Sequence, residues 1–168
     1  MTIWGRCRDF RPYCPAQALI NVTAMDDNSA PVSILSETEC WHLLSSVALG
    51  RLITSVEGEP DVFPVNFVVQ HKTVLFRTGV GTKLVSAAIN NRVVFEADDH
   101  GLTQGWSVVV KGTARILGTA EEIAEAQRAQ VLPWTATAKH HWVRIRPLTV
   151  TGRRFVFGPE PDHEAAFA

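Results

Sequence analysis

The stretch Ser107-Val-Val-Val-Lys-Gly-Thr-Ala-Arg-Ile116 decides the fold. Its odd-numbered positions are mostly polar, whereas its even-numbered positions from Val108 to Ile116 are apolar or small. Because successive residues of a strand point to opposite sides of a sheet, this alternation predicts a strand with one buried and one wetter face.

Shorter runs of β-branched and aromatic residues flank this stretch, and turn signals at 57–60 and 70–72 separate the first three of them. Six or seven short strands with few helices favour a mainly β fold, a small antiparallel barrel, over a parallel βαβ sheet. The additional strands that we expect are Leu52–Val56, Val62–Val69, Val74–Arg77, Val93–Ala97, Trp142–Arg146 and Val150–Phe157.

Three helices are expected, one before these strands and two among them. Ser36 with Glu39, and Thr119 with Glu122, form capping boxes, in which a hydroxyl and a carboxylate satisfy free N–H groups at a helix start. The first pair predicts a helix that carries Leu35, Trp41, Leu44 and Val47 and ends near Gly50, and the second a helix over Thr119–Gln130. The third predicted helix is Thr82–Ile89.

The 168 residues suffice for one domain with its own core. We expect residues 1–33 to be a poorly ordered extension without apolar periodicity, residues 34–158 to form the barrel, and residues 159–168 to form a polar tail.

Composition limits the function classes. The formal net charge of -1 offers no overall basic field for nucleic acid, and no apolar run is long enough to span a membrane. The three cysteines, without C-x-x-C spacing, favour neither a disulfide framework nor a zinc site, so we expect a cytoplasmic protein. The scattered histidines and the lack of a G-x-S-x-G sequence predict no metal ligands and no serine nucleophile, and we assign no catalytic side chain.

The segment Phe76-Arg-Thr-Gly-Val-Gly-Thr-Lys83 joins the end of a predicted strand to the start of a predicted helix. A helix start presents free N–H groups, and Arg77, Thr78, Thr82 and Lys83 add cations and hydroxyl donors, so the segment suits a phosphate. An ordinary turn with solvated charges fits the same pattern, which matches neither a P-loop nor a G-x-G-x-x-G loop.

Two further segments contain candidate ligand residues. Pro64 removes a ladder donor from its strand, which predicts an edge or bulge where backbone groups and Asn66 can bind a planar ligand; an edge guarded against aggregation is the alternative. Trp106, which precedes Ser107, can stack on a ring or simply pack in the barrel. Glu96, Asp98 and Asp99 are interpreted as solvated rim charges.

Taken in order, these segments resemble the pyridoxamine 5'-phosphate oxidase-like family of flavin-binding split barrels, in particular its flavin and deazaflavin oxidoreductase branch and its nitroimidazole-resistance-type relatives. The resemblance covers about Leu35 to Gly158. It is carried by Gly50-Arg-Leu, Pro60-Asp-Val-Phe-Pro-Val-Asn-Phe67, Phe76-Arg-Thr-Gly79, Gly81-Thr-Lys83, Gly105-Trp-Ser-Val-Val-Val-Lys-Gly112, Pro133-Trp134 and Thr151-Gly-Arg153.

The resemblance implies a homodimer with FMN bound between the subunits. Pro64, Val65, Asn66 and Phe67 would lie along the flavin ring, the phosphate would be held by Arg77, Thr78, Thr82 and Lys83, and Trp106 and Ser107 would come from the partner. The C-terminal part lacks the family's substrate-phosphate constellation, which argues against vitamin B6 oxidation.

Three functions therefore stay open. The first is an FMN-dependent oxidoreductase acting on a small organic substrate, in which the flavin carries the redox chemistry. The second uses the deazaflavin coenzyme, whose more anionic tail would need further cations such as Arg153 and Arg154. The third is a binding protein that holds flavin or haem without turnover.

Overall fold

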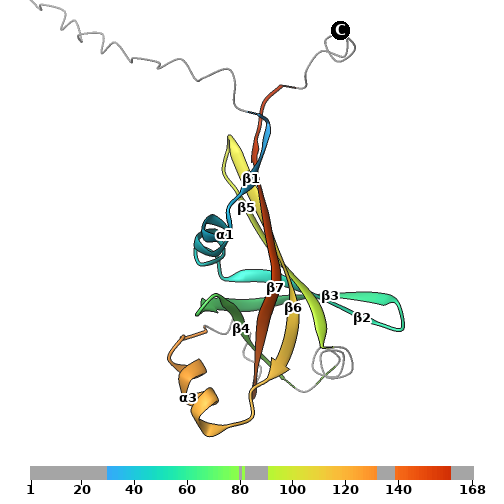
Figure 1. Ribbon diagram of the computed structural model, residues 1–168, viewed down its shortest axis with the longest axis vertical. Coiled ribbons are helices and arrows are strands. Elements are labelled where there is room, and N and C mark those ends of the chain that lie inside the picture. Colours follow the sequence, from blue (N-terminus) through green and yellow to red (C-terminus); the bar gives the residue numbers. More distant parts are fainter. Residues whose placement is uncertain (1–29, 80, 82–90, 132–138, 160–168) are drawn as a thin grey trace, which may run out of the picture.

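The computed structural model describes residues 30–79, 81, 91–131 and 139–159. These residues form seven strands and two helices (Figure 1). In chain order these are β1 (Val32–Leu35), α1 (Glu37–Leu44), β2 (Leu49–Val56), β3 (Glu59–Gln70), β4 (Thr73–Thr78), β5 (Arg92–His100), β6 (Gln104–Ile116), α3 (Ala120–Gln127) and β7 (His141–Val156).

All strand pairs are antiparallel, and the sheet closes on itself. The order is β1-β7-β4-β3-β2-β5-β6, and β6 pairs with β7 to complete the ring. This arrangement confirms the predicted antiparallel barrel. The ring is split because β7 has two different neighbours on one side: His141–Ile145 pairs with β4, whereas Gly152–Phe155 pairs with β1.

The strand β7 runs unbroken from His141 to Val156, so the prediction of two separate strands in this region was wrong. The interruption at Pro147 is a bulge, because Lys111 pairs with Thr149 and Gly112 with Pro147, which leaves Leu148 without a register partner on β6. A Cβ on Gly112 would lie only 2.2 Å from the carbonyl oxygen of Arg146, so this close crossing requires glycine.

The main core fills the barrel with the inward-facing residues of each strand. The rings of Phe67 and Phe95 meet edge to face with centroids 4.7 Å apart, and both side chains are buried. On β6 the predicted alternation holds, since Val108, Val110 and Ala114 are buried. A second cluster beneath α3 contains Leu75, Leu117, Ala126, Val131 and Trp142.

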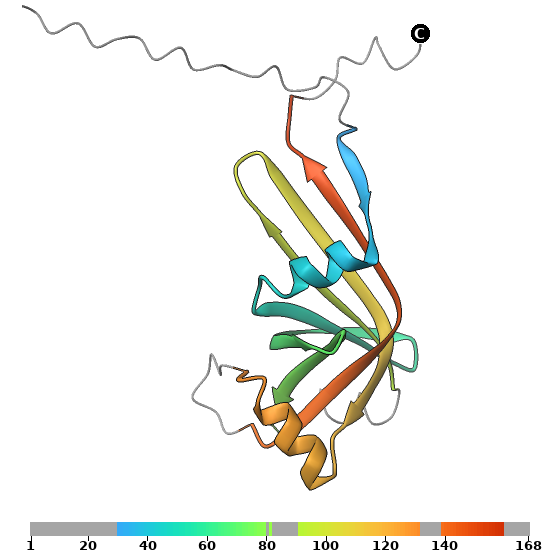
Figure 2. The same cartoon turned by 60° about the vertical axis from the view of Figure 1, so that its left-hand side comes forward.

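The helix α1 packs on the inner face through Cys40, Trp41 and Leu44 and lies across the sheet (Figure 2). Both predicted capping boxes are present: Ser36 with Glu39, and Thr119 with Glu122. The predicted end of α1 near Gly50 was wrong, because the helix ends at Leu44 and Gly50 belongs to β2.

Packing, rather than a helix cap, explains why position 50 is a glycine. A Cβ there would come within 2.3 Å of the Phe95 ring, so the ring of the core residue occupies the place of the missing side chain.

One predicted boundary differs from the structure, and one predicted helix lies outside the described residues. The sheet already includes residues 32 and 33 in β1, slightly before the expected start of the barrel at 34. The predicted helix over 82–89 lies outside the described residues. No helix among the described residues is long and apolar enough to cross a membrane.

Candidate functional site

Four of the predicted ligand residues lie on β3, and their side chains alternate between the two faces of the sheet. Val65 and Phe67 are buried in the core, so only their backbone groups can face a ligand. Pro64 is exposed on the outer face, in the part of β3 that pairs with β2, beyond the end of the β3–β4 pairing. Asn66 lies two residues further on, and its Nδ2 is buried without a hydrogen-bond acceptor in the described structure.

The adjacent strand β4 places Arg77 and Thr78 at its end. The Arg77 guanidinium lies over the ring of Trp142, 5.2 Å from the centroid, and Nη2 donates a hydrogen bond to the carbonyl oxygen of Lys139. Its Nε is buried without an acceptor in the described structure. Thr78 is buried and donates to the carbonyl oxygen of Gly79 over 3.3 Å. The other predicted phosphate ligands, Thr82 and Lys83, lie outside the described residues.

Trp106 and Ser107 lie at the opposite end of the sheet. Trp106 is half-buried and packs against the main core, whereas Ser107 faces outward. Arg77 pairs with Trp142 and Ser107 pairs with Arg153, so the two groups sit near opposite ends of β7, on the order of 30 Å apart along the strand. One chain therefore does not bring all of the predicted residues together.

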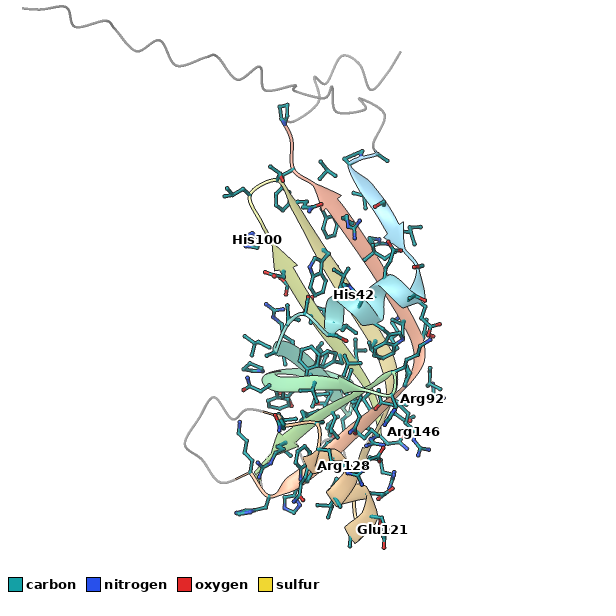
Figure 3. The ribbon with its side chains drawn as sticks, turned by 90° about the vertical axis from the view of Figure 1, so that its left-hand side faces the viewer. His42, Arg92, His100, Glu121, Arg128 and Arg146 are labelled. Atoms are coloured by element: carbon teal, nitrogen blue, oxygen red, sulfur yellow. The ribbon has the colours of Figure 1, made fainter. Side chains whose placement is uncertain are left out.

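An open groove of about 530 Å³ lies on the outer face beside Ser107. It is lined by Arg51, Glu96, Asp98, Asp99, His100, Gly105, Trp106, Ser107, Phe155 and Phe157. We call this the outer groove. Figure 3 shows His100 at the end of β5, beside the turn of the protruding β5–β6 hairpin.

Arg51 forms ion pairs with two of the carboxylates that line the outer groove. Its Nη1 donates to Asp98 and, over 2.8 Å, to Glu96, and these bonds to Asp98 and Glu96 raise the pKa of the guanidinium above its usual range. The carboxylates that the sequence presents as rim charges thus line a concave surface around a permanently charged arginine.

A smaller hollow of about 240 Å³ lies on the other side of Ser107. Its lining residues are Ile34, Ser107, Val109, Thr151, Gly152 and Arg153, and we call it the small hollow. Ser107 lines both depressions, so they adjoin.

Sequence reasoning did not single out Arg51, His100, Phe155 or Phe157 as site residues. The available signal was the period of two: His100, Asp98 and Glu96 occupy alternate positions of one strand. What the sequence could not supply was the register that places Phe155 opposite Gly105 on a strand fifty residues later in the chain.

The outer face also carries exposed apolar side chains. Ile34 is 88% exposed, Val62 59% and Phe157 48%. In contrast, the described residues contain no cluster of histidine, cysteine and carboxylate side chains able to hold a metal ion.

A closed antiparallel ring with a protruding sheet defines a split barrel. The chain belongs to the pyridoxamine 5'-phosphate oxidase-like family: the sequence model of the family described as Pyridoxamine 5'-phosphate oxidase matches residues 36–154. The resemblance found in the sequence is thereby confirmed.

Three relatives illustrate the match. The FAD binding protein from Mycobacterium smegmatis, whose structure is solved, is 61% identical, and the match covers 74% of this chain and 99% of that one with a TM-score of 0.67. A putative pyridoxamine 5'-phosphate oxidase from Corynebacterium glutamicum is 44% identical, covering 79% and 98% with a TM-score of 0.73. A protein of Mycobacterium tuberculosis strain H37Rv is 56% identical over 101 residues, 60% of this chain and 92% of its own.

Proposed function

We propose that the protein is a flavin-dependent oxidoreductase that binds its flavin nucleotide between two copies of the chain and acts on a small organic substrate. The observation that carries the proposal is the separation of the predicted ligand residues. Arg77 and Ser107 lie near opposite ends of β7, and a second copy placed on the outer face can bring one group next to the other.

The exposed apolar side chains support the presence of a second copy. Ile34 and Val62 lie on the same outer face as the two depressions, because the register aligns them with outward residues of β7 and β2. A two-fold related copy that covers Ile34 and Val62 removes their apolar surface from water, and it does so on both chains of the dimer.

The residues of β3 and β4 fit a flavin nucleotide. Asn66 Nδ2 and Arg77 Nε are buried donors without acceptors in the described structure, and a polar ring edge or a phosphate supplies acceptors. Arg77, with Lys83 from the following segment, would hold a phosphate, and FMN is the smallest flavin nucleotide that has one.

A bound flavin supplies the exchange of hydride or electrons with the substrate. In this proposal the chain orients the ring through Asn66 and the Pro64–Phe67 backbone, and the second copy excludes water from it. No side-chain acid or base is required of the described residues.

A second candidate function is flavin binding without turnover. It is favoured by one comparison in particular, because the 61% identical Mycobacterium smegmatis protein is described as an FAD binding protein. The same binding residues serve both functions, so only a turnover measurement distinguishes them.

The test is the visible spectrum of the purified full chain, followed by mass spectrometry of the released ligand. We expect an oxidised-flavin spectrum, or its appearance when FMN or FAD is titrated into the ligand-free protein. Reduction of the bound flavin by a nicotinamide donor would support the oxidoreductase, and stable binding without any reduction would support the carrier. No binding of either flavin would overturn both.

A further inference from the structure

We propose that the small hollow and the outer groove together bind the adenosine diphosphate half of FAD, with the phosphate beside Arg153 and the adenosine in the outer groove. This inference rests on the proposed function, since it requires that the protein binds a flavin nucleotide. It goes further by assigning a second nucleotide subsite on the strands β5, β6 and β7, near the end of β7 that lies away from Arg77 of the same chain.

The small hollow has the donors that a phosphate requires. Arg153 is exposed and makes no ion pair with another described residue, and it lies opposite Ser107 in the register. Thr151 lies opposite Val109, so the hydroxyls of Ser107 and Thr151 and the Arg153 guanidinium line the same depression. A guanidinium with adjacent hydroxyls offers charge-assisted and neutral hydrogen bonds to phosphate oxygens.

The outer groove has a preformed aromatic wall. Gly105 leaves room for Phe157, whose Cζ would be 3.1 Å from a Cβ at that position, and the Phe157 ring stands edge-on to His100 with centroids 6.5 Å apart. The backbone N–H of Phe157 donates to the carbonyl oxygen of Thr103 over 2.8 Å, which anchors the backbone that carries this ring. Aromatic rings provide stacking surfaces for a base.

The charges in the two depressions differ in a way that suits a nucleotide. The outer groove has three carboxylates, Glu96, Asp98 and Asp99, against the single guanidinium of Arg51, so it disfavours a phosphate. Carboxylate oxygens accept hydrogen bonds from ribose hydroxyls and from an adenine amino group. The uncharged nucleoside therefore suits the outer groove, and the anionic part suits the small hollow next to it.

The dimensions agree with this division. About 530 Å³ lies within the range of small-molecule sites, whereas the adjoining 240 Å³ is smaller. Because Ser107 lines both, the two parts of one ligand can occupy the two depressions on either side of this residue.

The test measures the affinities of FAD and FMN for the full chain and for Arg153→Gln and Phe157→Ala. We expect FAD affinity to fall about ten- to a hundredfold in Arg153→Gln, since a charge-assisted bond contributes about 1.5–3 kcal/mol and 1.4 kcal/mol is a factor of ten. A loss of roughly five- to a hundredfold is expected for Phe157→Ala from stacking. FMN affinity should stay at the wild-type value in both variants.

Matched controls are Lys111→Gln, which removes a cation from the adjacent strand β6 outside both depressions, and Leu102→Ala, which removes an exposed apolar side chain from the β5–β6 hairpin. Both should bind FAD as the wild type does. Sedimentation of each variant establishes that its assembly state is unchanged. In addition, ADP should compete with FAD but not with FMN.

The outcomes separate the two proposals. Equal weakening of FAD and FMN, or unchanged FAD binding in Arg153→Gln and Phe157→Ala, overturns the adenosine diphosphate subsite while leaving flavin binding intact. Failure of the wild-type protein to bind either flavin overturns the proposed function and the subsite with it.

Discussion

The two faces of β5 and β6 differ in what determines their residues. Phe95, Ala97, Val108 and Val110 point inward and are fully buried, whereas Glu96, Asp98 and Ser107 point outward into the outer groove. Inward residues are selected by volume and packing, so their pattern predicts the fold. Outward residues are free of that constraint, and their chemistry becomes interpretable only when the register shows which of them are neighbours.

The largest expected effect on stability comes from removing a buried side chain of the inner face. Phe95→Ala removes a buried ring that contacts Phe67 and occupies the space over Gly50, and should lower the free energy of unfolding by about 3–5 kcal/mol. Val109→Ala, on the outer face of the adjacent strand, should change it far less. Urea unfolding of both variants measures the contrast, and similar losses would contradict the distinction between the faces.

The next prediction concerns assembly through the outer face. The wild type should sediment as a dimer at micromolar concentration, whereas Ile34→Asp should shift it toward the 18.5 kDa single chain. Burial of one isoleucine contributes about 1.5–3 kcal/mol, and a two-fold interface contains the position twice. If the flavin-bound wild type sediments only as a single chain, the proposed interface is wrong.

The phosphate assignment is tested at Arg77 and Lys83. Each cation should contribute about 1.5–3 kcal/mol of charge-assisted binding, so Arg77→Ala or Lys83→Ala should weaken FMN about ten- to a hundredfold and leave riboflavin nearly unaffected. Thermal unfolding is the necessary control for Arg77, because its guanidinium also packs over Trp142. Equal weakening of both ligands would favour the ordinary-turn alternative.

The smallest expected effect is at the start of α3. Thr119→Ala removes the hydroxyl that accepts from the backbone of Glu122 and should cost about 1 kcal/mol.

Glu122 provides a pH test of the same contact. The hydrogen bond from Arg115, together with those from Gly118 and Thr119, lowers the pKa of the Glu122 carboxyl to about 2. A lowered pKa stabilises the fold above the ordinary value near 4.5, and the contribution is lost as the pH falls toward 2. Unfolding midpoints of Glu122→Gln and wild type should therefore converge on acidification; a constant difference would contradict this.

Local signals predicted the elements better than their connections. The alternation in β6 and the two capping boxes needed only neighbouring residues, and all three are present. The role of Gly50 depends on Phe95, forty-five residues away, and no local pattern reveals that contact. The continuity of β7 was missed for a related reason, since Pro147 resembles a strand end unless the bulge opposite Gly112 is known.

For the candidate site, the sequence indicates segments but not their arrangement. The positions of Arg77 and Ser107 near opposite ends of β7 follow from pairing that the sequence does not show, and so does the grouping of Phe155 and Phe157 with the β5 carboxylates. Adjacent outward residues come from strands far apart in the chain, so such a site becomes visible only with the topology.

The strand β7 pairs with β1, β4 and β6, and it is the last strand of the sheet to be synthesised. Until it emerges from the ribosome, the facing edges of three earlier strands lack this partner, and the ring cannot close. Nascent chains that stop before Trp142 should therefore expose open strand edges and aggregate or recruit chaperones, whereas release of the complete strand should allow rapid closure. Closure of this barrel is thus expected only after β7 has been synthesised.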